Sequence, residues 1–383
     1  MDVCSDSSFS HSIYDCETLA ITTAGRCDMI VYVNGRFMEY ALAGVTRYAF
    51  SVLKEIDAWL EQNSHLQIIL LVSSKNRYAC HYQHIEVRRI GHMSGILWEQ
   101  IELPFYTRGE FLLSLHCLAP VLKRNQVVVM HDAKFSRSDA CDQGVLRRYV
   151  YYGIGCLLGK QAKRIIAISQ FAAHDLEQGY HISPKNMQVV LSGMAPLDAD
   201  AGDVDIRARY GIFPKKYVLA VGGGRSKNNI VTVKAVEQLS GDMQFVLAGD
   251  VPADVKAELQ LYTKTKMIGR VTDAELVALY QSAFCLSFPS LVEGWGLPPV
   301  EAMMYGCPVI ASRCESVPEV CGEGALYLDD PHNAGELKVK ILQLEKDMKL
   351  YKKMQEKGYR NVARFDWKRT ARGIMEVVLG QVR

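Results

Sequence analysis

Residues 288–312, FPSLVEGWGLPPVEAMMYGCPVIAS, limit the fold of this chain more than any other stretch. The apolar run AFCLSFPS, which overlaps their start, is short enough to be a buried strand. A glycine-rich turn follows, and Pro298 and Pro299 suit the first turn of a helix, where a missing backbone N–H costs nothing. Gly306 ends that helix and Pro308 prevents its continuation, so VIAS is predicted to be the next strand. The stretch therefore predicts a strand, turn, helix and strand of an α/β protein.

Two carboxylates, Glu293 and Glu301, bracket this turn and helix. Gly294 and Gly296 let the backbone approach a ligand closely, and a helix start with open amides is a ready site for an anion. Carboxylates bind hydroxyl groups, so the pattern fits a phosphate-bearing, polyhydroxylated ligand such as a nucleotide sugar. Taken singly, Glu301 is explained as well by a favourable contact with the helix dipole, and Glu293 by an exposed loop charge.

The same segment resembles the signature of the retaining glycosyltransferases of family 4. These have the GT-B fold, an α/β architecture of two Rossmann-like, doubly wound parallel-sheet domains that face a central cleft. The resemblance spans nearly all of residues 28–379 and is strongest over residues 217–320. It implies that Glu293 lies at the donor sugar and that Glu301 binds the nucleotide ribose. The matching residues of the turn are Gly294, Trp295, Gly296 and Leu297, with Trp295 in place of the more usual Phe or Tyr.

Predicted strands and helices alternate along the whole chain, which indicates two tandem parallel sheets. The strands are predicted at MIVYVNGRF, LQIILLVSS, QVVVMHD and RIIAIS, and then at KYVLAVGGG, QFVLAGD and KMIGRV. A polar stretch without periodicity, residues 192–205, separates the two series and is the best candidate for a linker. We expect a poorly ordered extension over 1–27, a first, acceptor-side domain over 28–195, a linker over 196–213, a nucleotide-sugar-binding domain over 214–360 and, from the resemblance, a helix over 361–383 that crosses back to the first domain.

The composition is that of an ordinary globular protein. A net charge of +2 gives no case for nucleic acid as a main partner. The 11 cysteines form no CxxC pair, which favours a reduced, cytoplasmic protein. No apolar run reaches the roughly 18 residues of a spanning helix, and residues 1–27 lack the features of a secretory signal.

The positive charge is unevenly distributed. Residues 28–195 carry 18 Lys and Arg against 14 Asp and Glu, and residues 361–383 carry 5 against 2. This excess suggests that the first domain rests on an anionic membrane surface, at the inner face of the plasma membrane. A solvated surface of mixed charge explains the same counts. The basic residues that come in pairs are Arg88 and Arg89, Lys123 and Arg124, Arg147 and Arg148, and Lys163 and Arg164.

A second glycine-rich loop, residues 222–228 (GGGRSKN), follows a predicted strand. Arg225 and Lys227 supply positive charge for a diphosphate. The spacing is neither that of a dinucleotide-binding fingerprint nor that of a P-loop. In the resembled family a similar turn ending in Lys-Asn places basic residues on the donor diphosphate, which implies that role for Lys227 and Arg225, with Gly223 close to the ligand.

Two residues of the first domain are candidates for donor contacts. Gly44 opens a predicted helix, and the resemblance of GVTRY implies that it lets the loop approach the diphosphate; a plain helix-entry glycine is the alternative. His131 follows a strand at the edge where open α/β sheets bind ligands, and the resemblance implies a contact with the donor sugar. Arg47 and Tyr48 are assigned to packing and capping.

Two further loops complete the candidate site. The resemblance implies that the loop at Val271 holds the nucleotide base through backbone groups, before a helix capped by Thr272 or Asp273. The WEQ element, residues 98–100, resembles the acceptor side of the family; a buried aromatic beside a polar helix face is the alternative. Asp203-Val204-Asp205 looks like the metal-binding motif of another glycosyltransferase fold, but it lies in the predicted linker. We therefore expect no metal and no cofactor.

The resemblance implies transfer of a hexose, with retention of configuration, from a nucleotide diphosphate sugar. GDP-mannose is the favoured donor, and the acceptor is a saccharide or a polyprenyl-diphosphate-linked saccharide in surface-polysaccharide assembly. No carboxylate is an evident nucleophile, which favours front-face substitution. In that reaction the leaving diphosphate, held by Lys227 and Arg225, receives the acceptor proton. Two alternatives stay open: a nucleotide-sugar 2-epimerase of the same fold, and a catalytically silent GT-B partner protein.

Overall fold

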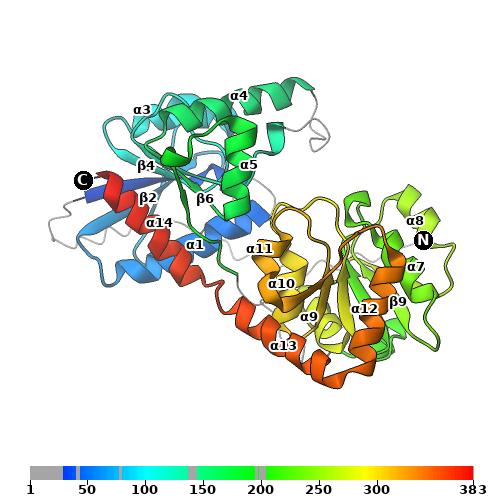
Figure 1. Cartoon of the computed structure of the whole chain (residues 1–383). Helices are drawn as coiled ribbons and strands as arrows, with labels where there is room; N and C mark the ends of the chain where they lie inside the picture. Colours follow the sequence, from blue (N-terminus) through cyan, green and yellow to red (C-terminus); the bar gives the residue numbers. More distant parts are fainter. Residues whose placement is uncertain are drawn as a thin grey trace, which may run out of the picture.

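The computed structural model describes residues 29–39, 44–76, 80–136, 145–194, 197 and 204–382. They form two parallel β-sheets, each covered by helices (Figure 1). The predicted fold class, two Rossmann-like parallel-sheet domains, is confirmed. The predicted extension over residues 1–27 and residues 198–203 of the predicted linker lie outside the described residues.

The first sheet has seven strands in the order β3-β2-β1-β4-β5-β6-β7. β1 pairs with β2 on one side and with β4 on the other, so the winding direction switches between β1 and β4. Open α/β sheets bind ligands at the carboxyl ends of the strands beside such a switch. The strands are β1 (Met29–Asn34), β2 (Leu66–Ser73), β3 (Glu86–Ile90), β4 (Phe111–Ser114), β5 (Gln126–Met130), β6 (Arg164–Ala167) and β7 (Met187–Val189).

The second sheet has six strands in the order β10-β9-β8-β11-β12-β13, with its switch between β8 and β11. The stretch that opened the sequence analysis forms a strand, a turn, a helix and a strand, as predicted. The strands are β8 (Tyr217–Val221), β9 (Gln244–Ala248), β10 (Thr265–Gly269), β11 (Cys285–Phe288), β12 (Val309–Ala311) and β13 (Ala325–Tyr327).

Helices connect the strands and cover both sheets (Figure 1). Those of the first domain are α1 (Gly44–Leu60), α2 (Gly95–Leu97), α3 (Leu103–Tyr106), α4 (Val145–Gln161) and α5 (Gln170–Tyr180), with a 3-10 turn η1 (Gly35–Glu39) and a π-helical turn η2 (Trp98–Glu102). Those that follow are α6 (Ile206–Tyr210), α7 (Asn229–Glu237), α8 (Ala253–Leu259), α9 (Asp273–Ser282), α10 (Leu297–Met304), α11 (Val317–Cys321), α12 (Ala334–Lys346), α13 (Met348–Val362) and α14 (Trp367–Val382), with a 3-10 turn η5 (Arg225–Lys227).

Helix α14 returns from the second domain and lies along α1 of the first domain (Figure 1). Its buried residues Ile374 and Val378 share one hydrophobic core with Val52 and Ile56 of α1 and with strand β1. Apolar side chains at this spacing form one stripe of each helix. The core of the first domain is therefore built from both ends of the described chain.

The region after the predicted linker begins with a helix rather than a loop. Asp205 caps α6 by accepting hydrogen bonds from the backbone N–H groups of Arg207 and Ala208, at 2.9 and 3.0 Å. Ile206 and Ile212 are buried in the core of the second domain. This part of the chain is therefore packed on the second sheet.

The two domains touch through a small apolar cluster and one carboxylate. Met194 of the first domain packs with Val300, Val320 and Phe365 of the second. Glu319 of α11 accepts hydrogen bonds from the backbone N–H groups of Gln170 and Phe171, both at 2.8 Å. These are the first two residues of α5, so a side chain of one domain caps a helix of the other.

Candidate functional site

Part of the turn before α10 is exposed to solvent, and hydrogen bonds fix the rest of it to neighbouring residues. Gly296 has a φ of +84° and is buried, a conformation that favours glycine. The backbone N–H of Glu293 donates to Glu315 at 2.6 Å, and Ser316 donates to the carbonyl of Glu293 at 3.0 Å. Among the described residues no side chain caps the start of α10. Pro298 and Pro299 have no N–H, so the helix-start amides open to an anion are those of the turn, up to Leu297.

Lys227 and Glu293 form an ion pair with 2.5 Å between Nζ and Oε1. Lys227 follows β8 and Glu293 follows β11, and these strands are neighbours at the switch point of the second sheet. The ammonium also lies 5.1 Å from the centre of the Phe288 ring. The sequence predicted both residues for the site, and the structure brings them into contact.

The loop that carries Lys227 is fixed by its neighbour Asn228. This residue has a φ of +53°, and its side-chain amide donates to the carbonyls of Pro289 and Pro331 at 3.2 and 2.8 Å. The backbone N–H of Leu291 donates to the carbonyl of Ser226 at 2.8 Å. These hydrogen bonds hold the two glycine-rich loops together and so fix the position of the Lys227 ammonium before a ligand binds.

Arg225 and Gly223 have contacts that differ from those of Lys227. Arg225 is exposed and pairs with Asp254 at the start of α8, so the structure does not join it to Glu293. A Cβ at Gly223 would lie 2.5 Å from the carbonyl oxygen of Asp250 and 2.7 Å from Val251. Glycine is therefore required there by the close approach of the next loop.

Glu301 lies in the middle of α10 and accepts a hydrogen bond from the hydroxyl of Tyr280 at 2.9 Å. Burial raises the pKa of this carboxyl above its ordinary value, while the Tyr280 hydrogen bond and the charge of Arg47 lower it. Arg47 belongs to α1, so its charge reaches Glu301 from the first domain. Sequence reasoning assigned Arg47 to packing or capping and did not single out Tyr280; only the GVTRY motif pointed to Arg47.

His131 follows β5, and its imidazole lies edge-to-face against Tyr48 with 4.7 Å between ring centres. Its backbone N–H donates to Sγ of Cys117 at 3.3 Å. Burial lowers the pKa of His131 to about 4, so the ring is neutral near pH 7. Nε2 is buried and has no hydrogen-bond partner among the described residues. A neutral ring with one unpaired nitrogen is suited to bind a hydroxyl group.

The remaining predicted donor residues lie at the starts of α1, α9 and α10. Gly44 is the first residue of α1. Trp295 packs edge-to-face on Phe365, with 5.7 Å between ring centres, and also against the core of the first domain. Gly294 and Leu297 are exposed. Val271 precedes α9, whose cap is Thr272 with a complete capping box to Glu275.

Within the described ranges no three His, Cys, Asp or Glu side chains are grouped so as to hold a metal ion. Of the Asp203-Val204-Asp205 sequence, Asp205 is the cap of α6 and Asp203 lies outside the described residues.

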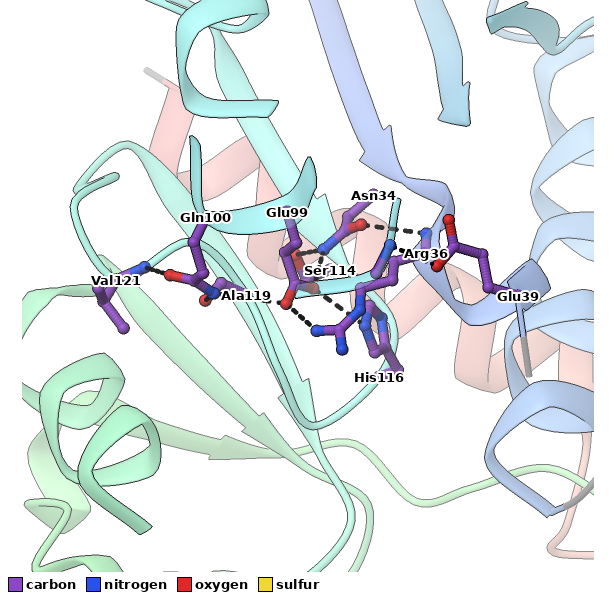
Figure 2. Close-up of polar contacts among 10 residues, drawn as sticks. Asn34, Arg36, Glu39, Glu99, Gln100, Ser114, His116, Ala119 and Val121 are labelled. Atoms are coloured by element: carbon purple, nitrogen blue, oxygen red, sulfur yellow. Dashed lines mark hydrogen bonds and ion pairs between the residues drawn. The ribbon is translucent and has the colours of Figure 1, made fainter. Parts of the chain in front are cut away.

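In the WEQ element Trp98 and Glu99 are buried and Gln100 is half-buried, and the buried tryptophan agrees with the alternative interpretation. Trp98 is fully buried, and its Nε1 donates to the carbonyl of Ile90 at 3.1 Å. Glu99 is also fully buried and is surrounded by polar partners from other elements (Figure 2). Gln100 binds the backbone of Ala119 and Val121 at 2.9 and 3.0 Å.

The second domain matches a protein family. Residues 205–361 match the model described as "Glycosyl transferases group 1". This region contains Lys227, Glu293 and Glu301 together with the helix start between the glutamates. Residues 205–361 are therefore similar to the group 1 glycosyl transferases.

Two curated relatives are bacterial. The chain is 29% identical over 231 residues to the serotype-specific mannosyltransferase WbdA of Escherichia coli, which is 55% of this chain and 28% of that protein. It is 25% identical over 228 residues to the O-antigen chain mannosyltransferase RfbU of Salmonella typhimurium, 57% of this chain and 61% of the relative. The chain thus spans less than two thirds of either relative.

The fold is shared with solved structures. The crystal structure of HepE from Anabaena in complex with UDP and glucose superposes with a TM-score of 0.66, at 17% identity, over 92% of this chain and all of that one. Together with the two sheets described above, this likeness establishes the GT-B architecture.

Proposed function

We propose that this protein transfers a hexose from a nucleotide diphosphate sugar to a saccharide acceptor. The observation that carries the proposal is the contact between Lys227 and Glu293 beside the uncapped start of α10. It lies inside the region matched by the group 1 glycosyl transferases. A cation, open amides and a carboxylate at one sheet edge suit a ligand that has both a diphosphate and hydroxyl groups.

Each group has a role in the proposed reaction. Lys227 and the amides of the turn before α10 bind the diphosphate, whose negative charge grows as it departs. Glu301 binds ribose hydroxyls, and the neutral ring of His131 offers Nε2 to a sugar hydroxyl. Glu293 orients Lys227 and lies at the sugar. Arg225 would join the diphosphate only by leaving Asp254, so its contribution is smaller than that of Lys227.

The stereochemical course is retention by front-face substitution, as in family 4. The bond from the anomeric carbon to the diphosphate oxygen breaks, and the acceptor oxygen bonds to that carbon on the same face. The acceptor proton passes to the departing diphosphate. Lys227 stabilises that leaving group, and the positive charge and helix-start amides replace a metal ion in this role.

The donor is proposed to be GDP-mannose, and the acceptor a saccharide or a polyprenyl-diphosphate-linked saccharide of a surface polysaccharide. The support is that both relatives described above are named mannosyltransferases, one of them of the O-antigen chain. The same similarities favour transfer over 2-epimerisation or a catalytically silent partner role.

A membrane surface is the proposed place of action, with α4 as the attachment. Along the described ranges, every helix is too short or too polar to cross a bilayer. Helix α4 carries exposed Leu146, Tyr149 and Val150 on one face beside the exposed Arg147. Apolar side chains flanked by cations are typical of a helix that lies on an anionic leaflet.

Most other basic pairs have protein partners. Lys123 is buried and donates to the carbonyls of Thr107 and Glu110 at 2.6 and 2.7 Å, so it is not a surface charge as the sequence analysis assumed. Lys163 donates to the carbonyl of Gln381, and Arg88 pairs with Glu86. The membrane proposal therefore rests on α4 alone.

The test is a screen of radiolabelled nucleotide sugars against a membrane lipid extract and soluble saccharides. We expect GDP-mannose to label an acceptor product with the unaltered chain and not with Lys227→Ala. Incubation with donor alone separates the alternative, because an epimerase converts the donor without an acceptor. Labelling from another donor only would reject mannose, and no labelling from any donor would reject transfer.

A further inference from the structure

A buried group of charged residues lies in the first domain, at the carboxyl ends of β1 and β4 (Figure 2). Its centre is Glu99 of η2, whose side chain has no exposed surface. Glu99 pairs with Arg36 of η1 and lies 3.1 Å from Nε2 of His116. Asn34, the last residue of β1, donates to Glu99 at 2.9 Å and to Ser114, the last residue of β4, at 3.2 Å.

Such a group is expensive to bury. Removing a carboxylate and a guanidinium from water costs several kcal/mol per ion before their attraction is counted. Burial raises the pKa of Glu99, but the hydrogen bond and charge of His116, with Arg36 and Asn34, outweigh it and hold the pKa below its ordinary value. The Glu99 carboxylate is therefore charged and held in one position. Buried polar networks of this kind favour a single arrangement of the residues that form them.

The group is connected to His131 through three consecutive residues. His116, which contacts Glu99, lies between Leu115 and Cys117 in the segment that follows β4. Cys117 accepts the hydrogen bond from the backbone N–H of His131 at 3.3 Å. Burial lowers the pKa of His131, and the backbone of Leu115 raises it by a smaller amount, which places Leu115 beside the ring. Since Nε2 has no partner among the described residues, we assign Nδ1 as the nitrogen that faces Leu115.

We propose that Glu99 is a positioning residue for His131. By holding His116, it fixes residues 115–117, which in turn fix the tautomer and direction of the His131 ring so that Nε2 faces the donor sugar. Through Arg36 the same carboxylate holds η1, which leads toward Gly44 and α1. The inference rests on the proposed function for the role of His131, but the positioning itself is a property of the folded chain.

The experiment reads the His131 ring directly. The full chain is labelled with ¹⁵N-histidine, His131 is assigned by its loss in His131→Asn, and long-range proton–nitrogen NMR reports the tautomer. In the unaltered chain we expect one neutral tautomer with the proton on Nδ1. Glu99→Gln should give mixed tautomers, and Glu102→Gln is the matched control, because it makes the same change in the same π-helical turn at a half-buried side chain that binds the backbone of His92 and Met93 and not residues 115–117.

Kinetics form the second measurement. A ring displaced from the sugar should lower kcat by roughly 10- to 100-fold, with the donor KM changed less than threefold. An unaltered tautomer in folded Glu99→Gln would overturn the proposal. Should Glu99→Gln fail to fold, His116→Asn removes the imidazole that links Glu99 to residues 115–117 and keeps the Arg36 partner of Glu99, and an unaltered His131 spectrum in that variant overturns the proposal equally.

The two parts of the experiment separate the two proposals. A changed His131 spectrum in a chain that transfers no sugar would keep the positioning role and reject the proposed function. An unchanged spectrum in a chain whose unaltered form transfers mannose would reject only the positioning role.

Discussion

Nζ of Lys227 lies 2.5 Å from Oε1 of Glu293, although 66 residues separate them in the chain. The pair has side-chain exposures of 23% and 11%, so the ammonium is partly shielded and already oriented. The Lys227 ammonium would therefore not have to move when the diphosphate departs. Such preorganisation is the condition for strong electrostatic stabilisation.

Lys227→Ala is expected to lower kcat by roughly 10²-fold or more, because its charge acts chiefly on the leaving group. Lys234→Ala is the matched control, since Lys234 is exposed on α7, the helix that follows the same loop. Steady-state kinetics with saturating acceptor measure the effect. A rise in donor KM at constant kcat would show that Lys227 binds the ground state equally well.

Glu301→Ala is expected to raise the donor KM by roughly 10-fold or more, with a smaller fall in kcat. A hydrogen bond between a carboxylate and the ribose is present in both the ground state and the transition state, and such bonds are worth about 1.5–3 kcal/mol. Tyr280→Phe removes only the hydroxyl that orients Glu301 and should raise KM less. Donor binding by calorimetry provides an independent measurement; equal affinity in Glu301→Ala would remove the ribose assignment.

Activity is expected to persist in excess EDTA. The reasoning is that Lys227 and the helix-start amides supply the positive potential that a metal supplies in other transferases. Product formation is measured before and after dialysis against the chelator. Activity that is lost and then restored by magnesium or manganese would contradict the proposal.

His131 should make the protein less stable in acid. Its pKa is about 4 in the folded chain, below the ordinary 6.5, so the unfolded chain binds more protons between these values. The free energy of unfolding should therefore fall as the pH drops from about 6.5 to 4, and part of that slope should vanish in His131→Asn. His174→Asn, at an exposed position of α5, is the control and should keep the slope. Urea titrations across this range measure both.

Helix α4 should bind anionic vesicles. Leu146→Asp is expected to reduce co-sedimentation with such vesicles, because it places a negative charge on the proposed contact face. Leu261→Asp is the matched control, since Leu146 and Leu261 are 80% and 79% exposed and Leu261 lies in the second domain. Binding should fall as salt rises. Equal losses in both variants, or none in either, would reject α4 as the attachment.

Long strands with apolar runs were predictable from the sequence, whereas strands that depend on neighbours were not. β3 has four exposed residues of five and pairs only at the edge of the sheet, so its sequence EVRRI gave no signal. β4 is fully buried but only four residues long, and periodicity cannot identify so short a run. Both lie outside residues 217–320, where the family resemblance is strongest.

The candidate site was predictable as a set of residues but not as a set of contacts. Glu293 and Lys227 were each found from local motifs, because glycine-rich turns and helix starts leave local patterns. The partnership of Glu99 with Arg36 spans 63 residues and depends on strand order, which no local pattern encodes. Tyr280 was missed because a tyrosine in a largely apolar helix has the same pattern whether or not it binds a carboxylate.

The return of α14 to α1 has a consequence for how the chain folds during synthesis. Ile374 and Val378 belong to the same hydrophobic core as Val31 and Val52. The core of the first domain is therefore incomplete until the ribosome has made nearly all of the described chain. The core clusters of the second domain contain no residue of α14 and are complete by the end of α13, so this domain is able to fold first. Domains usually fold in the order of their synthesis. Here the first domain in the sequence is the last to complete its core. A fragment ending at the linker would expose the apolar face of α1.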